Sequence, residues 1–322
     1  MPDLIGKTIL VTGGSGYIGT KLCKYLLAQN IRELRILSRT EWRQFEFEQA
    51  VGKDRRLRQH MGDIRNRDRL QSVMHGADAI FHLAAMRDIA RCDYNVSEAV
   101  STNAVPGTTN VIDLAPICGV SKVIFSSTAE AVYPTNVYGS SKLQSERLMM
   151  RAHQSHFPVS NFVCVRFGNV LGGKGSLIPT IPIRMVNKQE VTLYHKDMAR
   201  RVQTADEAVA QLVAALDAPS GSIVIKSMPL AYVKDILVLC AEYLDMQPNF
   251  VLGCPRKGEK LVNRLYADEE TDLLRDFTEG YYILDRANKP DKPAKWLAHD
   301  RMGTDALRKL LWQVLDEWKQ TS

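Results

Sequence analysis

The chain has 322 residues, of which 45% are hydrophobic and 24% are charged. These proportions are typical of a globular protein and exclude the disordered, collagenous and fibrous classes. Lysine and arginine (42) outnumber aspartate and glutamate (36), giving a net charge of +6 that is spread along the chain. This balance suits anionic small molecules as well as nucleic acid, so charge alone does not identify a partner.

The sequence also indicates the cellular compartment in which the protein is expected. No run approaches the ~18 consecutive apolar residues of a membrane span, and the N-terminus lacks the basic and apolar regions of a signal peptide. The six cysteines are scattered, with no CxxC pair and no Cys/His spacing suited to zinc. We therefore expect buried thiols in a reducing cytosol, a soluble cytoplasmic protein and no metal site.

Short apolar segments alternate with helical ones through the first half of the chain. This alternation predicts right-handed βαβ crossovers and therefore an α/β fold, a parallel sheet with helices on both faces. After residue 168 the pattern loosens, and only a strand at 222–226 and a closing helix at 303–319 are predicted. The earlier strands are predicted at 7–12, 33–38, 58–61, 77–83, 123–127 and 162–167, and the helices at 20–29, from 40, 67–75, 96–118 and 138–155.

A glycine-rich turn follows the first predicted strand. The spacing of Gly13, Gly16 and Gly19 permits a tight turn, a close approach of backbone N–H groups to a pyrophosphate, and helix–strand packing. The positive end of the next helix would favour the phosphates. The pattern alone also fits a plain structural turn, but its place inside a βαβ unit favours a dinucleotide. The predicted cradle consists of Gly13, Ser15, Gly16, Tyr17, Ile18 and Gly19.

The end of the second predicted strand bears on which dinucleotide binds. An acidic residue there would bind the ribose hydroxyls of NAD. The chain has Ser38 and Arg39 instead, with Arg43 nearby, and a guanidinium matches a 2′-phosphate. The sequence therefore favours NADP over NAD. Asp63 and Ile64 are expected at the adenine, and further cofactor contacts are expected from Leu83, Ala84, Ala85 and Asn103.

Tyr138 and Lys142 are four residues apart on a predicted helix and so share one face. A cation beside a phenol lowers its pKa from the usual value of ~10. Such a tyrosine takes the proton of an alcohol while hydride leaves for a nicotinamide. Thr128, at the end of the preceding strand, would hydrogen-bond the same oxygen. An ordinary helix surface also carries this spacing by chance, but the glycine turn upstream favours catalysis.

Longer motifs cover most of the chain, including TGGSGYIG (12–19), SSTAEAVYPTNVYGSSK (126–142), RFGNVLGGKGSLIP (166–179) and RKGEK (256–260). With them the chain resembles the extended short-chain dehydrogenases/reductases of the NAD-dependent epimerase/dehydratase superfamily. Among these it is similar to the 4,6-dehydratases of polysaccharide biosynthesis that act on UDP-N-acetylglucosamine. The resemblance implies a Rossmann domain, a bound nicotinamide cofactor, a UDP-hexosamine substrate, and a homodimer or higher oligomer, with no nucleic-acid or membrane partner.

The domain boundaries follow from the element pattern, which loosens after residue 168 and returns to a sheet strand at 222–226. We expect the Rossmann domain at residues 1–167 together with about 222–245, and the substrate-binding region at 168–221 and 246–322. The resemblance implies that the subunits meet through the helices around 98–114 and 138–155.

The chain departs from these dehydratases just before Tyr138. In the family an aspartate and a lysine serve there as the acid and base of water elimination, and this chain has Ala129 and Glu130. Glu130 can remove the C5 proton that a C4 ketone acidifies and then deliver it to the leaving hydroxyl. Dehydration is the favoured interpretation. The alternatives are a 4-epimerase, which needs no C5 chemistry, and a non-catalytic NADP-binding regulator.

The substrate contacts are inferred mainly from charge and resemblance. Arg200 and Arg256 would bind the UDP phosphates, Asn169 the diphosphate, and Arg87 the sugar pocket. His82 and His195 could in principle be general bases, but packed or loop histidines are the favoured interpretation.

Overall fold

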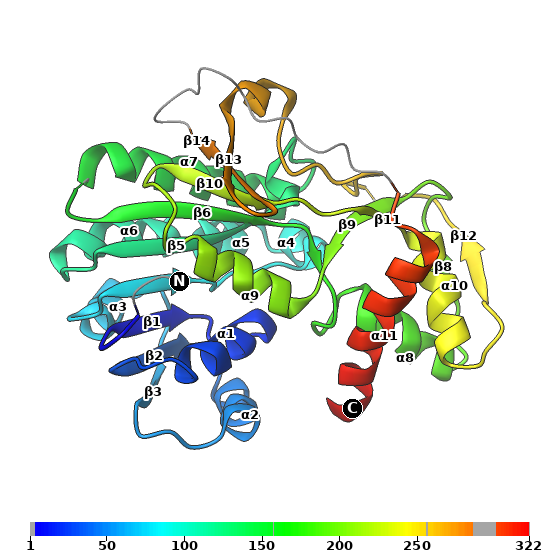
Figure 1. Ribbon diagram of the computed structural model, residues 1–322, viewed down its shortest axis with the longest axis horizontal. Coiled ribbons are helices and arrows are strands. Elements are labelled where there is room, and N and C mark those ends of the chain that lie inside the picture. The colour runs from blue at the N-terminus through cyan, green and yellow to red at the C-terminus, as the bar shows by residue number, and fades with distance from the viewer. Residues whose placement is uncertain (1–3, 157, 256, 286–300, 322) are drawn as a thin grey trace.

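The computed structural model describes residues 4–156, 158–255, 257–285 and 301–321 (Figure 1). Its centre is a large sheet with the strand order β13-β14-β10-β6-β5-β4-β1-β2-β3. The strands from β10 to β3 pair in parallel, whereas β14 and β13 are antiparallel. Their bounds are β1 (Thr8–Thr12), β2 (Glu33–Ser38), β3 (Leu57–Met61), β4 (Ala79–His82), β5 (Lys122–Thr128), β6 (Asn161–Phe167), β10 (Ser222–Lys226), β13 (Leu274–Thr278) and β14 (Tyr281–Asp285).

Helices cover both faces of this sheet because successive strand residues point to opposite sides. Leu10 and Phe125 pack with α3, α6 and α7, whereas Ile9, Val11 and Ile124 pack with α1, α2 and α9. The predicted doubly covered Rossmann-type α/β fold is therefore confirmed. The helices are α1 (Tyr17–Leu27), α2 (Glu41–Val51), α3 (Arg67–Met74), α4 (Ile89–Tyr94), α5 (Val96–Asn103), α6 (Gly107–Ile117), α7 (Val137–His156) and α9 (Ala205–Ala214).

A third apolar cluster lies beyond the end of the large sheet, where Figure 1 shows α8, α10 and α11 gathered. The predicted closing helix is confirmed as α11, whose Leu307, Leu311 and Leu315 are buried in this cluster. The remaining helices are α8 (Leu177–Val186), α10 (Val233–Tyr243) and α11 (Thr304–Thr321). One short sheet consists of β7 (Asn169–Val170), β9 (Ala199–Gln203) and β11 (Leu230–Tyr232), and another of β8 (Val191–Leu193) and β12 (Phe250–Leu252). The 3-10 turns are η1 (Ala129–Ala131) and η2 (Asp268–Leu273).

The structure differs from the sequence expectation at two helices. The helix expected at 96–118 is broken into α5 and α6, because Pro106 lacks an amide hydrogen and disfavours helical backbone at Val105 before it. The helix after the glycine turn begins at Tyr17 rather than at 20, so Gly19 lies inside it.

The C-terminal half is also divided differently from the expected boundaries. β13 and β14, expected in the substrate-binding region, extend the large sheet from β10. Conversely, α10, expected in the Rossmann domain, packs with α8 and α11. The sequence signal that places β14 in the large sheet was weak. β14 pairs antiparallel with β10 across a long connection, which leaves no βαβ pattern in the sequence.

Two further findings concern the described part of the chain. None of its helices combines the length and the apolar character that crossing a bilayer requires. Five cysteines are buried, but Cys254 is exposed, contrary to the expectation of buried thiols.

Candidate active site

The glycine turn lies at the carboxyl end of β1, the edge where parallel sheets bind ligands. A side chain on Gly13 would lie 2.8 Å from the backbone nitrogen of Ala84, and one on Gly19 would lie 2.6 Å from the carbonyl oxygens of Gly13 and Gly14. Only glycine permits these approaches. Because Gly16 caps α1 without a side-chain hydrogen bond, the first-turn N–H groups are left for another acceptor. The turn therefore fits a diphosphate.

Two other predicted cofactor residues, Tyr17 and Ala84, make close contacts with glycines near the turn. The ring of Tyr17 lies against Gly172 and Gly173, since a side chain on either glycine would contact it. Ala84, after β4, approaches Gly13. The predicted contacts Ser15, Ile18, Leu83 and Ala85 belong to these same segments, and their part in binding stays a prediction.

The end of β2 has a free polar group suited to a ribose. The Ser38 hydroxyl is buried and has no hydrogen-bond partner. Next to it, the partly exposed Arg39 guanidinium lies 3.4 Å from Asp63 and 3.3 Å from Glu98. Asp63 is held mainly by Arg65, with a shortest distance of 2.7 Å. These residues fit a ribose with or without a 2′-phosphate.

Two predicted cofactor residues have scaffolding roles in this structure. The Asn103 amide donates to the carbonyl of Met86 and to the hydroxyl of Ser141, and its oxygen accepts from the Met86 N–H. It therefore fixes the segment after β4 against α7. Ile64 is buried, and its carbonyl accepts from Asn110.

The predicted redox pair lies on the first turns of α7, beside the end of β5. Burial raises the pKa of Tyr138 to about 12, although a hydrogen bond with Thr128 favours the ionised form. Lys142 is buried, and its Nζ atom donates to the carbonyl of Ser126 at 2.7 Å. The expected grouping of phenol, threonine and lysine is thus present at one strand end.

The electrostatics of this pair differ from the sequence expectation. We expected Lys142 to lower the pKa of Tyr138, but the pKa is raised because the phenol is removed from water and Glu130 is nearby. The ammonium of Lys142 turns instead toward the backbone of β5. Spacing on a helix predicts that two side chains share a face, but it does not predict burial.

Glu130 lies in the turn η1 directly after β5 and faces a polar cluster. Its Oε1 accepts from Asn263 at 3.0 Å, and its Oε2 accepts from Asn136 at 3.3 Å and lies 3.6 Å from the Nζ of Lys260. Asn263 also donates to Asn169 at 3.1 Å. Sequence reasoning missed Asn136, Lys260 and Asn263 as site residues.

The predicted substrate residues fall into three groups. Arg200 is buried and bonded to Glu259 and to the carbonyl oxygens of Ala199 and Leu261, so its guanidinium is already engaged. Arg87 is exposed and donates to the carbonyl of Lys174. Although burial raises the pKa of Tyr138, the charge of Arg87 acts to lower it, so the guanidinium lies near the phenol. Arg256 lies outside the described residues.

Neither histidine has the features of a general base. His82 is buried between Thr12 and Thr108, and burial lowers its pKa to about 3. His195 lies in a loop, where it accepts from the backbone of Asp197 at 3.1 Å. Both observations agree with the structural interpretation. Within the described residues, no group of three or more His, Cys, Asp or Glu could hold a metal ion.

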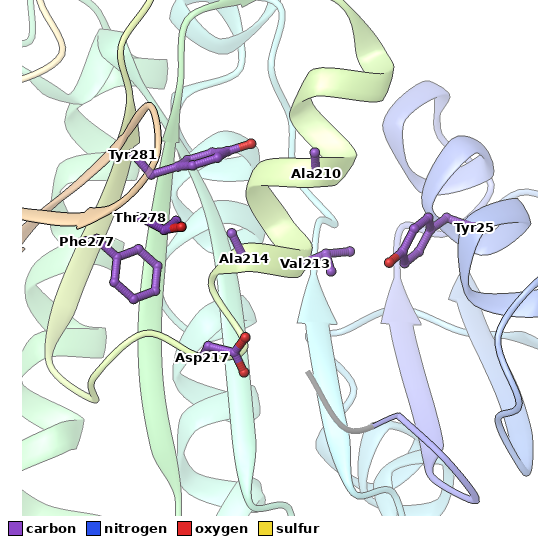
Figure 2. Close-up of a pocket in the computed structure, with 8 residues that line it drawn as sticks. All are labelled: Tyr25, Ala210, Val213, Ala214, Asp217, Phe277, Thr278 and Tyr281. Atoms are coloured by element: carbon purple, nitrogen blue, oxygen red, sulfur yellow. The ribbon is translucent and has the colours of Figure 1, made fainter. Parts of the chain in front are cut away.

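A separate hollow lies beside α9. Figure 2 shows its lining by α1, α9 and the β13–β14 hairpin. The cavity holds about 400 Å³, and none of the predicted site residues lines it. Its lining residues are Tyr25, Ala210, Val213, Ala214, Asp217, Phe277, Thr278 and Tyr281.

Comparison with known proteins shows the family of this chain. A family model described as polysaccharide biosynthesis protein matches residues 9–285. The chain belongs to this family. Among the relatives of this chain, an uncharacterized membrane protein of Methanocaldococcus jannaschii is 34% identical over 322 residues, covering 96% of both chains. A UDP-glucose 4-epimerase of Rickettsia massiliae is 31% identical over 282 residues, covering 85% of this chain and 82% of the relative.

Solved structures share the architecture of this chain. The X-ray structure of Pen from Bacillus thuringiensis is 31% identical, with a TM-score of 0.90 over 97% of this chain and 98% of that one. DesIV of Streptomyces venezuelae, a dTDP-glucose 4,6-dehydratase with NAD and TYD bound, has a TM-score of 0.77 over 96% and 97% of the chains. At 22% identity, DesIV shows the fold alone.

Proposed function

We propose that this protein is a nucleotide-sugar dehydratase that acts on a UDP-N-acetylhexosamine and uses a bound nicotinamide cofactor, NADP in preference to NAD. The main support is the juxtaposition of Glu130 with Tyr138 and Thr128 at the end of β5. The carboxylate is close enough to disfavour ionisation of the phenol, and its side chain is only 13% exposed. A hydroxyl base and a carbon base are thus next to each other.

The proposed reaction uses these groups in order. Tyr138 takes the proton of the C4 hydroxyl, and Thr128 holds its oxygen by a hydrogen bond. A nicotinamide cofactor held at the glycine turn of Gly13, Gly16 and Gly19 would supply the acceptor and donor of the C4 hydride, which is needed at C6, and a positive charge that favours the phenolate. Glu130 then takes the C5 proton, which the C4 ketone has acidified, and delivers it to the C6 oxygen. The C6–O bond breaks, and that oxygen leaves as water. As hydride returns to C6, C5 takes a proton from solvent through Glu130, and Tyr138 gives the proton of the C4 hydroxyl back to solvent.

Glu130 has both roles because its neighbour has none. Ala129 is completely buried and carries only a methyl group, so the proton for the leaving hydroxyl cannot come from its side chain. A single carboxylate that collects and returns one proton balances the elimination without another acid.

A 4-epimerase is the second candidate. It is supported by the UDP-glucose 4-epimerase of Rickettsia massiliae, 31% identical to this chain, and by the alanine at position 129. Tyr138, Lys142 and Thr128 would suffice for that reaction, since the 4-keto sugar would turn and take hydride on its other face. Glu130 would then contribute nothing to the chemistry.

Incubation with NADP and UDP-N-acetylglucosamine in D2O distinguishes these functions by NMR and mass spectrometry. Dehydration predicts loss of one water and a deuteron at C5. Epimerisation predicts an unlabelled galacto-configured product of unchanged mass. If no product forms with either NADP or NAD, although the protein binds NADP, the result would contradict both enzymatic functions. It would then favour a non-catalytic NADP-binding regulator.

Two variants sharpen the result. Tyr138→Phe should abolish either reaction, whereas Glu130→Gln should abolish dehydration and leave epimerisation intact. A fully active Glu130→Gln dehydratase would remove Glu130 from the mechanism.

A further inference from the structure

The turn that carries Glu130 is held by a segment far away in the sequence, residues 258–263. The Gly258 carbonyl accepts from the hydroxyl of Thr135 at 2.7 Å and from the amide of Asn136 at 3.0 Å. A side chain on Gly258 would lie 2.9 Å from the Thr135 carbonyl oxygen, and its φ of +77° favours glycine. This segment therefore packs directly against the loop after β5.

Lys260 is the central contact between these two segments. Its Nζ atom donates to the carbonyl oxygens of Val132 at 2.7 Å, Glu130 at 3.0 Å and Ala129 at 3.2 Å. The Oε2 atom of Glu130 lies 3.6 Å from the same nitrogen, and the lysine side chain is only 10% exposed. One ammonium thus fixes the backbone of η1 and faces the carboxylate that η1 carries.

These contacts leave the ammonium without a proton to give to a substrate. An ammonium has three N–H donors, and three backbone carbonyls accept from Lys260. Lys260 therefore acts on the site through Glu130 rather than by touching the sugar.

The surrounding charges make this lysine important for Glu130. Arg200, on β9, also acts on the carboxylate, but its guanidinium is bonded to Glu259. Arg166, on β6, acts on Lys260 electrostatically and is itself paired with Glu146 and Glu270. On α7, Tyr138 is the remaining titratable neighbour, with Arg87 next to it. Among the described residues, Lys260 is the cation within ion-pair distance of Glu130.

We propose that Lys260 is a positioning residue, which fixes the backbone of η1 and so orients the Glu130 carboxylate as the base for the C5 proton. This inference rests on the proposed function for its catalytic meaning. The pairing itself can be measured in the free enzyme.

The direct test is carbon-13 NMR of the full chain labelled at glutamate carboxyl carbons, recorded at one fixed pH. The Glu130 signal is assigned by its absence in Glu130→Gln. Lys260→Gln keeps hydrogen-bond donors without the charge, Lys260→Met removes both, and Lys260→Arg keeps the charge. Lys257→Gln is the matched control, because Lys257 is an exposed lysine directly before the segment.

We expect the Glu130 carboxyl resonance to move in Lys260→Gln and Lys260→Met, since the carboxylate loses the ammonium that lies 3.6 Å from it. Lys260→Arg and Lys257→Gln should give the resonance of the unmodified protein. A resonance that stays in place in Lys260→Gln overturns the proposal. If Lys260→Met fails to fold, Lys260→Gln still carries the test.

A catalytic readout separates this proposal from the proposed function. The rate of C5 deuterium exchange should fall about tenfold or more in Lys260→Met, because the base is misplaced, while C4 oxidation, followed as reduced cofactor, should change only a few-fold. If the Glu130 resonance moves but the unmodified enzyme never exchanges C5, the ion pair stands and dehydration fails. If exchange occurs and its rate is the same in Lys260→Met, the positioning role fails and dehydration stands.

Discussion

The Nζ atom of Lys142 lies 2.7 Å from the carbonyl oxygen of Ser126, on the strand next to the helix that carries the lysine. The same nitrogen lies 4.4 Å from the ring centre of Phe125. Lys142 is therefore enclosed by β5, and burial lowers its pKa to about 8. A buried ammonium with one carbonyl partner stabilises the fold less than an apolar side chain of the same length.

Replacement of Lys142 by methionine tests that statement. The folded-state pKa of about 8 lies below the reference value of 10.5, so between pH 8 and 10.5 the unfolded chain holds a proton that the folded chain has lost. Stability should rise with pH across that window, and the ammonium should cost about 3 kcal/mol below it. Lys142→Met should lack this rise and be about 1–2 kcal/mol more stable at pH 7, after the lost hydrogen bond is counted.

Urea denaturation at pH 7 and pH 10 measures the effect. The variant should also lose activity by about 10²-fold or more. Equal pH dependence in both proteins would show that Lys142 is solvated. A stable variant with full activity would remove it from the catalytic group.

The glycine cradle gives a second prediction. Gly19→Ala would place a methyl group 2.6 Å from two backbone carbonyl oxygens, which cannot move away as a flexible side chain can. We expect a loss of roughly 2–4 kcal/mol in stability and a large fall in affinity for NADP. Gly303→Ala is the control, because a side chain there meets nothing within 4 Å. Thermal melts and calorimetric titration with NADP measure both quantities, and a Gly19→Ala protein with normal affinity would contradict the assignment.

The sequence predicted the sheet well because its strands are buried on both faces and read as short apolar runs. It also predicted that Tyr138 and Lys142 share a helix face, since that depends only on local periodicity. The contacts of Asn263 and Lys260 with Glu130 could not be predicted this way. They join segments about 130 residues apart, and only the path of the chain between them brings the groups together.

The broken helix at 96–118 had a visible signal. Pro106 marks the interruption, and a stricter use of proline as a helix breaker would have found it. By contrast, the raised pKa of Tyr138 follows from packing around the phenol, which no local pattern records. Cytoplasmic location, oligomeric state and the roles of the predicted site residues stay predictions.

Arg39 provides the test of cofactor choice. Its guanidinium is 46% exposed and lies more than 3 Å from both Asp63 and Glu98, so these weak pairs leave it able to turn toward a 2′-phosphate. Arg39→Ala should weaken NADP binding about tenfold and leave NAD binding within about twofold. Arg58→Ala, a change at another exposed arginine on the neighbouring strand, is the control. Equal losses for the two cofactors, measured by calorimetry, would contradict the preference for NADP.

A buried ionic network beneath the site supports the last prediction. The Arg166 guanidinium makes two hydrogen bonds to Glu146, both at 2.7 Å, and two to Glu270, at 2.6 and 3.0 Å. It also donates to the carbonyl of Leu265 at 3.1 Å. Because Leu265 and Glu270 follow closely after Asn263, this network connects β6 to the segment that binds Glu130.

Removal of the arginine alone should be severe, because two carboxylates would stay buried without a cation. Arg166→Met is expected to lower the free energy of unfolding by about 3–5 kcal/mol. The triple variant Arg166→Met, Glu146→Gln, Glu270→Gln removes the unpaired charges and should recover more than half of that loss. Urea denaturation of the three proteins measures the difference. If the triple variant is no more stable than Arg166→Met, the loss of stability comes from lost packing rather than from unpaired carboxylates. The network would then stabilise the protein by filling space and not by pairing charges.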